Sequence, residues 1–116
     1  MKLMHVTIRT DKFEEEVNFY KEVAGLQITR DMRPMGRDIV FLANNEHATE
    51  IEIIKDEEAK DAGNDNISIG FKSDDLVRKM EELEEKGIRT SGLIKPSPMV
   101  KFFFVTDPAG VKVQFM

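Results

Sequence analysis

The sequence contains no cysteine and no tryptophan. Without cysteine the chain cannot form disulfides, thiolate zinc sites or iron–sulfur clusters, and it has no cysteine nucleophile. No apolar run approaches the roughly 18 residues of a membrane-spanning helix, and the start of the chain lacks an apolar segment of signal-peptide length. We therefore expect a cytoplasmic protein with no membrane partner.

Positive charge is in the minority, since 17 Lys and Arg stand against 22 Asp and Glu and the net charge is −5. Nucleic-acid binding depends on clustered Lys and Arg, so we expect no nucleic-acid partner. A chain of 116 residues, 41% of them hydrophobic, has the size and composition of one globular domain. The expected organisation is a single domain over residues 1–116.

Within that domain the sequence repeats itself. Residues 5–13 and 68–76 both show an alternating strand, then Thr or Ser, then Asp, then the apolar start of a helix. Thr10 and Ser73 are the predicted N-caps, because their hydroxyls can accept an orphan backbone N–H. Both predicted helices end at a glycine, Gly25 and Gly87, the residue favoured at a left-handed helix end.

The strands after each helix also correspond. Ile39–Leu42 matches Lys101–Phe104, and Thr49–Ile53 matches Val111–Phe115. The sequence thus predicts an α+β fold of two βαβββ modules, at about 1–55 and 66–116, joined by a polar linker from Lys55 to Asp65. The modules are expected to form a curved, mostly antiparallel sheet with the helices on its outer face.

Alternation along the strands separates two faces. Met4, Val6 and Ile8 are predicted to lie under the first helix. The opposite face collects polar side chains, namely His5, Thr7, Arg9, Glu50, Glu52, Ser68, Lys72, Lys112 and Gln114. Such a face can simply meet solvent, but two curved half-sheets also enclose a concave groove of the kind in which small molecules bind.

Five segments in this order resemble the vicinal oxygen chelate superfamily, which groups glyoxalase I, bleomycin and fosfomycin resistance proteins and extradiol dioxygenases. They are Met4–Val6, Phe19–Leu26, Ile51–Ile54, Gly70–Leu76 and Asp107–Phe115. The resemblance implies a homodimer and a divalent metal ion (Ni, Zn, Mn or Fe) on the concave face. It also implies four ligand positions, one on the first and one on the last strand of each module, here His5, Glu52, Ser68 and Gln114.

The residues at those positions leave the function open. His5, Glu52 and Gln114 are candidate metal ligands, whereas the hydroxyl of Ser68 is a poor one. Glu52 and Glu50 are candidate catalytic carboxylates, but Gln114 stands where glyoxalase-like members keep a carboxylate base, and an amide cannot move a proton. His5 can alternatively do no more than hydrogen-bond Glu52.

Three functions follow from these alternatives. The first is a small-molecule-binding protein with a degenerate metal site, and the second is a metal-dependent lactoylglutathione lyase-like lyase or isomerase using His5 and Glu52. The third is a structural or subunit role. For a ligand in the groove, the candidate contacts are Thr7, Arg9, Ser68, Lys72 and Lys112. Arg9 and Lys72 can alternatively have no ligand-binding role and pair with Glu50 and solvent.

Overall fold

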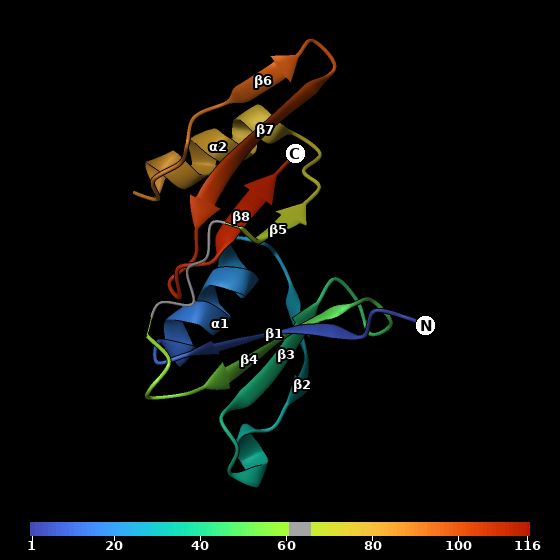
Figure 1. Cartoon of the computed structure of the whole chain (residues 1–116), viewed down its shortest axis with the longest axis vertical. Coiled ribbons are helices and arrows are strands. Elements are labelled where there is room, and N and C mark those ends of the chain that lie inside the picture. Colours follow the sequence, from blue (N-terminus) through green and yellow to red (C-terminus); the bar gives the residue numbers. More distant parts are fainter. Residues whose placement is uncertain (61–65) are drawn as a thin grey trace. The chain divides into compact units, whose positions relative to one another are not determined.

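The computed structural model describes residues 1–60 and 66–116 (Figure 1). The chain divides into two compact units, residues 1–62 and 63–116, which we call the first and the second module. Each module has one α-helix and one four-stranded sheet, and the element order is the same in both. The predicted α+β fold of two βαβββ copies is therefore confirmed.

The first module forms a mixed sheet in the order β1-β4-β3-β2. β1 and β4 are parallel, and the pairs β3–β4 and β2–β3 are antiparallel. Its elements are β1 (His5–Thr10), α1 (Phe13–Glu22), β2 (Gln27–Asp31), the 3-10 turn η1 (Arg33–Met35), β3 (Ile39–Ala43) and β4 (Glu50–Lys55).

The second module repeats this topology with the strand order β5-β8-β7-β6. β5 and β8 are parallel, and β7 is antiparallel to both of its neighbours. Its elements are β5 (Ser68–Phe71), α2 (Leu76–Glu85), β6 (Ile94–Ser97), β7 (Val100–Thr106) and β8 (Lys112–Phe115).

The core of each module lies between its helix and one face of its sheet. In the first module α1 buries Val17 and Tyr20, while β4 buries Ile51 and Ile53. In the second module the buried aromatic pair Phe103 and Phe115 stacks with ring centroids 5.3 Å apart. Alternate residues of the same strands are left on the other face, which we call the open face of each sheet.

The edge strand β1 is less covered than its apolar alternation predicts. Ile8 is 5% exposed, as expected, but Met4 is 61% and Val6 41% exposed. The reason is that α1 packs mainly on β3 and β4, the two inner strands of the sheet. The prediction that Met4 and Val6 lie under the helix is therefore wrong.

The helix ends confirm one prediction and correct another. Gly25 and Gly87 adopt the left-handed conformation, with φ of 72° and 80°. The caps, however, lie nearer to the helices than predicted: Asp75, not Ser73, caps α2 by accepting a hydrogen bond from the Arg78 N–H at 3.2 Å. The Thr10 hydroxyl accepts from the backbone N–H of Lys12 at 2.9 Å, one residue before α1 begins.

The start of the predicted linker belongs to the first module. Lys55 is the last residue of β4. Beyond it, the Asp56 N–H donates to the Thr10 carbonyl at 2.9 Å, and the Asp11 N–H donates to the Ala59 carbonyl at 3.1 Å. The rest of the predicted linker, residues 61–65, lies outside the described residues.

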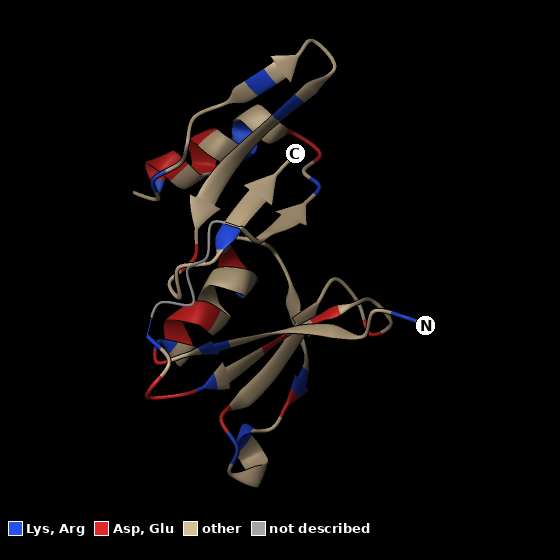
Figure 2. Cartoon of the chain, viewed as in Figure 1, with Lys and Arg blue, Asp and Glu red and all other residues tan. Residues whose placement is uncertain are grey.

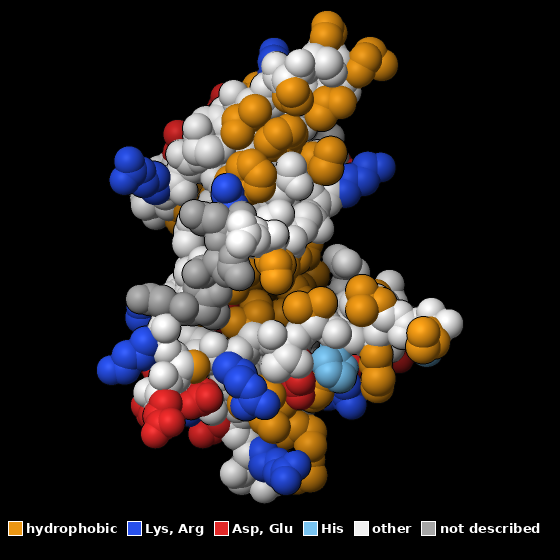
Figure 3. All heavy atoms as spheres, in the orientation of Figure 1, with side chains coloured by type: hydrophobic (Ala, Val, Ile, Leu, Met, Phe, Trp, Pro, Cys, Tyr) orange, Lys and Arg blue, Asp and Glu red, His pale blue; other side chains and the backbone are white. Residues whose placement is uncertain are grey.

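Surface character differs between elements of the second module. Acidic positions mark α2 in Figure 2, where the exposed residues include Glu81, Glu82, Glu84 and Glu85. Hydrophobic side chains gather instead on the β6–β7 hairpin in Figure 3, where Ile94, Met99 and Val100 are exposed. Among the described residues, no helix has both the length and the apolar character needed to span a membrane.

Candidate functional site

The open face of the first sheet brings together the polar residues predicted from β1 and β4. Because these strands are parallel and in register, His5 lies opposite Glu50 and Thr7 opposite Glu52. Alternation then places all four side chains on the same face. The neighbouring strand β3 adds Phe41, which lies opposite Glu52 on the other side of β4.

Both β1 side chains, His5 and Thr7, approach the carboxylate of Glu52. The Thr7 hydroxyl donates a 2.6 Å hydrogen bond to Glu52 Oε1, and His5 Nε2 lies 3.6 Å from the same oxygen. The imidazole also packs edge-on against Phe41, with ring centroids 5.9 Å apart. His5 Nδ1 is buried and has no hydrogen-bond partner among the described residues, so only the Nε2 side of the ring faces a polar neighbour.

Glu50 is held by a different set of residues. Arg30 donates two hydrogen bonds to its carboxylate, from Nη2 to Oε1 at 2.8 Å and from Nε to Oε2 at 3.2 Å. Thr29 donates its hydroxyl to Oε2 at 2.6 Å. Burial raises the pKa of Glu50, but the hydrogen bonds from Arg30 and Thr29 outweigh it, so the pKa lies below its ordinary value.

Arg30 is therefore the partner of Glu50, and the sequence analysis missed it. The guanidinium carbon lies over the Phe41 ring, 3.7 Å from its centroid, and this cation–π contact holds Arg30 on the open face. Among the described residues of the first module, no ion pair joins Glu50 to Arg9, so Arg9 is not the partner of this carboxylate. The alternative pairing of Glu50 with Lys72, a residue of the second module, stays a prediction.

The open face of the second sheet has a different chemistry. Ser68 lies opposite Lys112 and Gly70 opposite Gln114 across the parallel strands β5 and β8. A Cβ added to Gly70 would come within 3.7 Å of Gln114 Oε1, so the amide lies directly beside the glycine. The Lys112 ammonium sits 4.5 Å from the centroid of the Phe104 ring.

The donors of the first module suit part of a metal site. His5 Nε2 and Glu52 Oε1 are 3.6 Å apart, a separation that one divalent ion can bridge with bonds of about 2.0–2.2 Å. The other two positions that the resemblance implies as ligands lie in the second module and carry the hydroxyl of Ser68 and the amide of Gln114. Glu52 is thus the one carboxylate in that predicted set of four. Within residues 1–60 and 66–116, no three His, Asp or Glu side chains lie close enough together to hold an ion.

Comparisons with known proteins agree with this fold. The lactoylglutathione lyase of Neisseria meningitidis serogroup A is 28% identical over 125 residues, an alignment that covers 100% of this chain and 90% of the relative. The structure of the trypanothione-dependent glyoxalase I of Leishmania major has a TM-score of 0.77 at 18% identity, covering 100% of this chain and 86% of that one. A glyoxalase family protein from Enterococcus faecalis has a TM-score of 0.76 at 23% identity, covering 98% and 95%.

A family model gives the broader assignment. The model of the glyoxalase/bleomycin resistance protein/dioxygenase superfamily matches residues 2–115, which is nearly the whole chain. The match includes both modules and every strand that carries a predicted site residue. On this evidence the chain belongs to the glyoxalase/bleomycin resistance protein/dioxygenase superfamily.

Proposed function

We propose that this protein binds a small molecule on the open faces of its sheets and that it does so without a divalent metal ion. The observation that carries the proposal is the donor set: Glu52 is the one carboxylate at the four ligand positions of the superfamily, and Ser68 and Gln114 are both uncharged. A neutral hydroxyl is a weak donor for Ni, Zn, Mn or Fe. One carboxylate also leaves a divalent ion with an uncompensated positive charge.

The nearby carboxylate does not supply the missing charge. Both oxygens of Glu50 already accept hydrogen bonds from Arg30 and Thr29. Releasing Glu50 toward an ion would leave the Arg30 guanidinium without its counter-charge over the Phe41 ring. The Glu50–Arg30 pair is therefore better suited to shape the floor of a ligand site than to complete a metal shell.

Thermal unfolding with added metal tests this proposal. The protein is purified without chelator and without nickel resin, and its melting temperature is measured with and without millimolar Ni²⁺, Zn²⁺, Mn²⁺ or Fe²⁺. We expect no change. An ion at 100 times its dissociation constant would add about 2.7 kcal/mol of stability, which raises the melting temperature by several degrees. A rise of that size that disappears in both His5→Ala and Glu52→Gln would overturn the proposal.

A metal-dependent lyase is the second candidate. It is favoured by the 28% identity to a lactoylglutathione lyase over the whole chain and by the 3.6 Å approach of His5 to Glu52. Its test is turnover of the hemithioacetal of methylglyoxal and glutathione in the presence of each metal. Activity above the blank that is lost in Glu52→Gln supports the lyase, and a rate equal to the blank with every metal removes it.

We also propose that the protein forms a homodimer, because it belongs to this superfamily. Sedimentation velocity should give a mass twice the 13.3 kDa of the chain. The mass of a monomer throughout the micromolar range would contradict this.

A further inference from the structure

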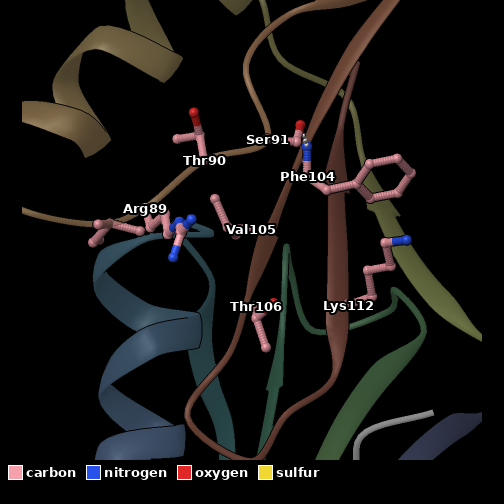
Figure 4. A pocket seen from close by; sticks show the side chains of 8 residues that line it. Arg89, Thr90, Ser91, Phe104, Val105, Thr106 and Lys112 are labelled. Atoms are coloured by element: carbon pink, nitrogen blue, oxygen red, sulfur yellow. Dashed lines mark hydrogen bonds between the residues drawn. The ribbon is translucent and has the colours of Figure 1, made fainter. Parts of the chain in front are cut away.

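A cavity of about 520 Å³ lies along β7, entirely within the second module (Figure 4). It opens beside the C-terminal half of the strand, beyond the part that pairs with β6. Its lining residues are Ile88, Arg89, Thr90, Ser91, Phe104, Val105, Thr106 and Lys112. Of these, the sequence analysis singled out Lys112 alone.

The lining is positively charged although the chain as a whole is acidic. Among the residues that the structure describes, Arg89 and Lys112 are the two charged residues of the lining, and no Asp or Glu takes part. Neither cation forms an ion pair with a carboxylate of the residues that the structure describes. A cavity with two unpaired cations in a protein of net charge −5 attracts anions.

Lys112 is the better placed of the two cations for direct contact. Its ammonium lies 4.5 Å from the centroid of the Phe104 ring, and Thr106 is its register partner on β7. Figure 4 shows the Phe104 side chain of β7 and the Lys112 side chain of β8 extending toward the same side, whereas Arg89 lies on the opposite side of the view. A small anion would therefore contact Lys112, and Arg89 would add to the positive potential of the cavity.

The wall beside Lys112 is fixed by hydrogen bonds. The Ser91 N–H donates to the Phe104 carbonyl at 2.9 Å, and the Phe104 N–H donates back to the Ser91 hydroxyl at 2.9 Å. Thr90 accepts a hydrogen bond from the Gly92 N–H at 3.1 Å, which leaves its own hydroxyl hydrogen available. Thr106 is an exposed residue, and its hydroxyl is a second potential donor.

We propose that this cavity binds the anionic end of a small molecule, a carboxylate or a phosphate, with Lys112 as the charged contact and Thr106 as the neighbouring hydroxyl donor. The Phe104 ring would contact the apolar part of the same molecule. This inference rests on the proposed small-molecule function and adds the chemical class of the ligand.

The test is a titration followed by ¹⁵N NMR of the full chain in a buffer containing chelator. Three probes share a phenyl ring: benzoate carries the carboxylate, phenyl phosphate carries the phosphate, and benzamide is neutral. We expect at least one anion to give saturable shifts at the amides of Ser91, Phe104, Thr106 and Lys112, and benzamide to bind at least tenfold more weakly. Which anion binds more tightly identifies the group that the cavity takes.

Variants of Lys112 show whether the charge is responsible. Lys112→Gln should weaken anion binding about tenfold, since charge-assisted hydrogen bonds contribute more than neutral ones. Lys112→Arg should retain most of the affinity. Lys101→Gln is the matched control, because Lys101 is an exposed lysine of the neighbouring strand β7 that does not line the cavity. A dispersed spectrum shows that each variant is folded.

Two results would overturn the inference: no saturable shift with either anion, or equal affinities of wild type and Lys112→Gln. The outcomes also separate it from the proposed function. A small molecule that shifts only β1 and β4 would overturn the anion site and leave metal-independent binding standing. Stabilisation by metal, together with anion binding at Lys112, would overturn metal-independent binding and leave the anion site standing.

Discussion

At the scale of single residues, the carboxylate of Glu50 is fixed by its surroundings on the first sheet. Both of its oxygens accept hydrogen bonds, and its main partner Arg30 is itself stacked on Phe41. Glu50→Gln replaces one acceptor oxygen with an N–H₂ group that faces the guanidinium. We expect the free energy of unfolding in urea to fall by about 1.5–3 kcal/mol, the usual contribution of a hydrogen bond to a charged group.

Glu46→Gln is the control for this substitution, because Glu46 is exposed and forms no ion pair among the described residues. The effect should also depend on pH. Since the folded-state pKa of Glu50 lies below its ordinary value of 4.5, the carboxylate contributes its full stabilisation above that value and loses it as the pH falls through the folded pKa. Equal losses of stability at pH 7 and pH 2 would contradict this account.

Asp31 is a second carboxylate whose pKa is lowered by hydrogen bonds from an arginine, and this pKa can be measured directly. Hydrogen bonds from the Arg33 side chain and from the Arg33 backbone N–H lower the pKa of Asp31 from 3.8 to about 2. We expect an NMR titration of the Asp31 carboxyl carbon to give this value, and Arg33→Gln to return it toward 3.8. The stabilisation is present above about pH 4 and is lost as the pH falls toward 2. An unchanged titration in Arg33→Gln would rule out Arg33 as the cause.

The contacts of these residues show where sequence patterns stop being informative. The approach of His5 to Glu52 follows from alternation along two parallel strands of one module, and it was predicted. The contact of Arg30 with Glu50 could not be predicted from the sequence, because β2 carries an irregularity between Ile28 and Arg30. There Thr29 and Arg30, which are consecutive, both contact the same carboxylate, whereas strict alternation would have placed them on opposite faces.

At the scale of elements, the start of α2 depends on one side chain. Asp75 accepts a hydrogen bond from the Arg78 N–H at 3.2 Å, which satisfies one of the orphan donors of the first turn. Asp75→Ala should lower the free energy of unfolding by about 1 kcal/mol, the typical effect of losing an N-cap. Asp74→Ala, one residue earlier and also exposed, should have little effect. Equal effects of the two substitutions would show that the cap is not responsible.

This cap also shows the limit of a repeat argument for element boundaries. Ser73 and Asp75 are both good N-cap residues, and the match with Thr10 favoured the earlier one. In the structure neither Thr10 nor Ser73 is the cap, because both helices begin later than the repeat suggested. The glycines were more reliable guides, since only a few residue types tolerate the positive φ at which Gly25 and Gly87 end their helices.

At the scale of the whole molecule, the duplication was predictable because independent signals agreed in both copies: strand patterns, the Thr or Ser followed by Asp before each helix, and terminal glycines. The ligand chemistry was less predictable, because the two copies carry different residues at equivalent positions. The first module carries His5 and Glu52, whereas the second carries Ser68 and Gln114. A fold shared by the whole superfamily does not decide between binding and catalysis, so the function has to be argued from the chemistry of these four side chains.

Their role can be tested by restoring the donors that the second module lacks. At the four positions that the resemblance to the superfamily implies as ligands, Ser68→His combined with Gln114→Glu supplies two histidines and two carboxylates, enough negative charge to neutralise a divalent ion. We expect this double variant to gain several degrees of melting temperature with millimolar Ni²⁺ or Zn²⁺, while the wild type gains none. Lys101→Glu with Thr90→His adds the same residue types elsewhere in the second module and should gain nothing. If the double variant binds metal no better than this control, the missing donors are not what separates this chain from metal-binding members of the superfamily. If the wild type gains as much as the double variant, the metal-independent function is wrong.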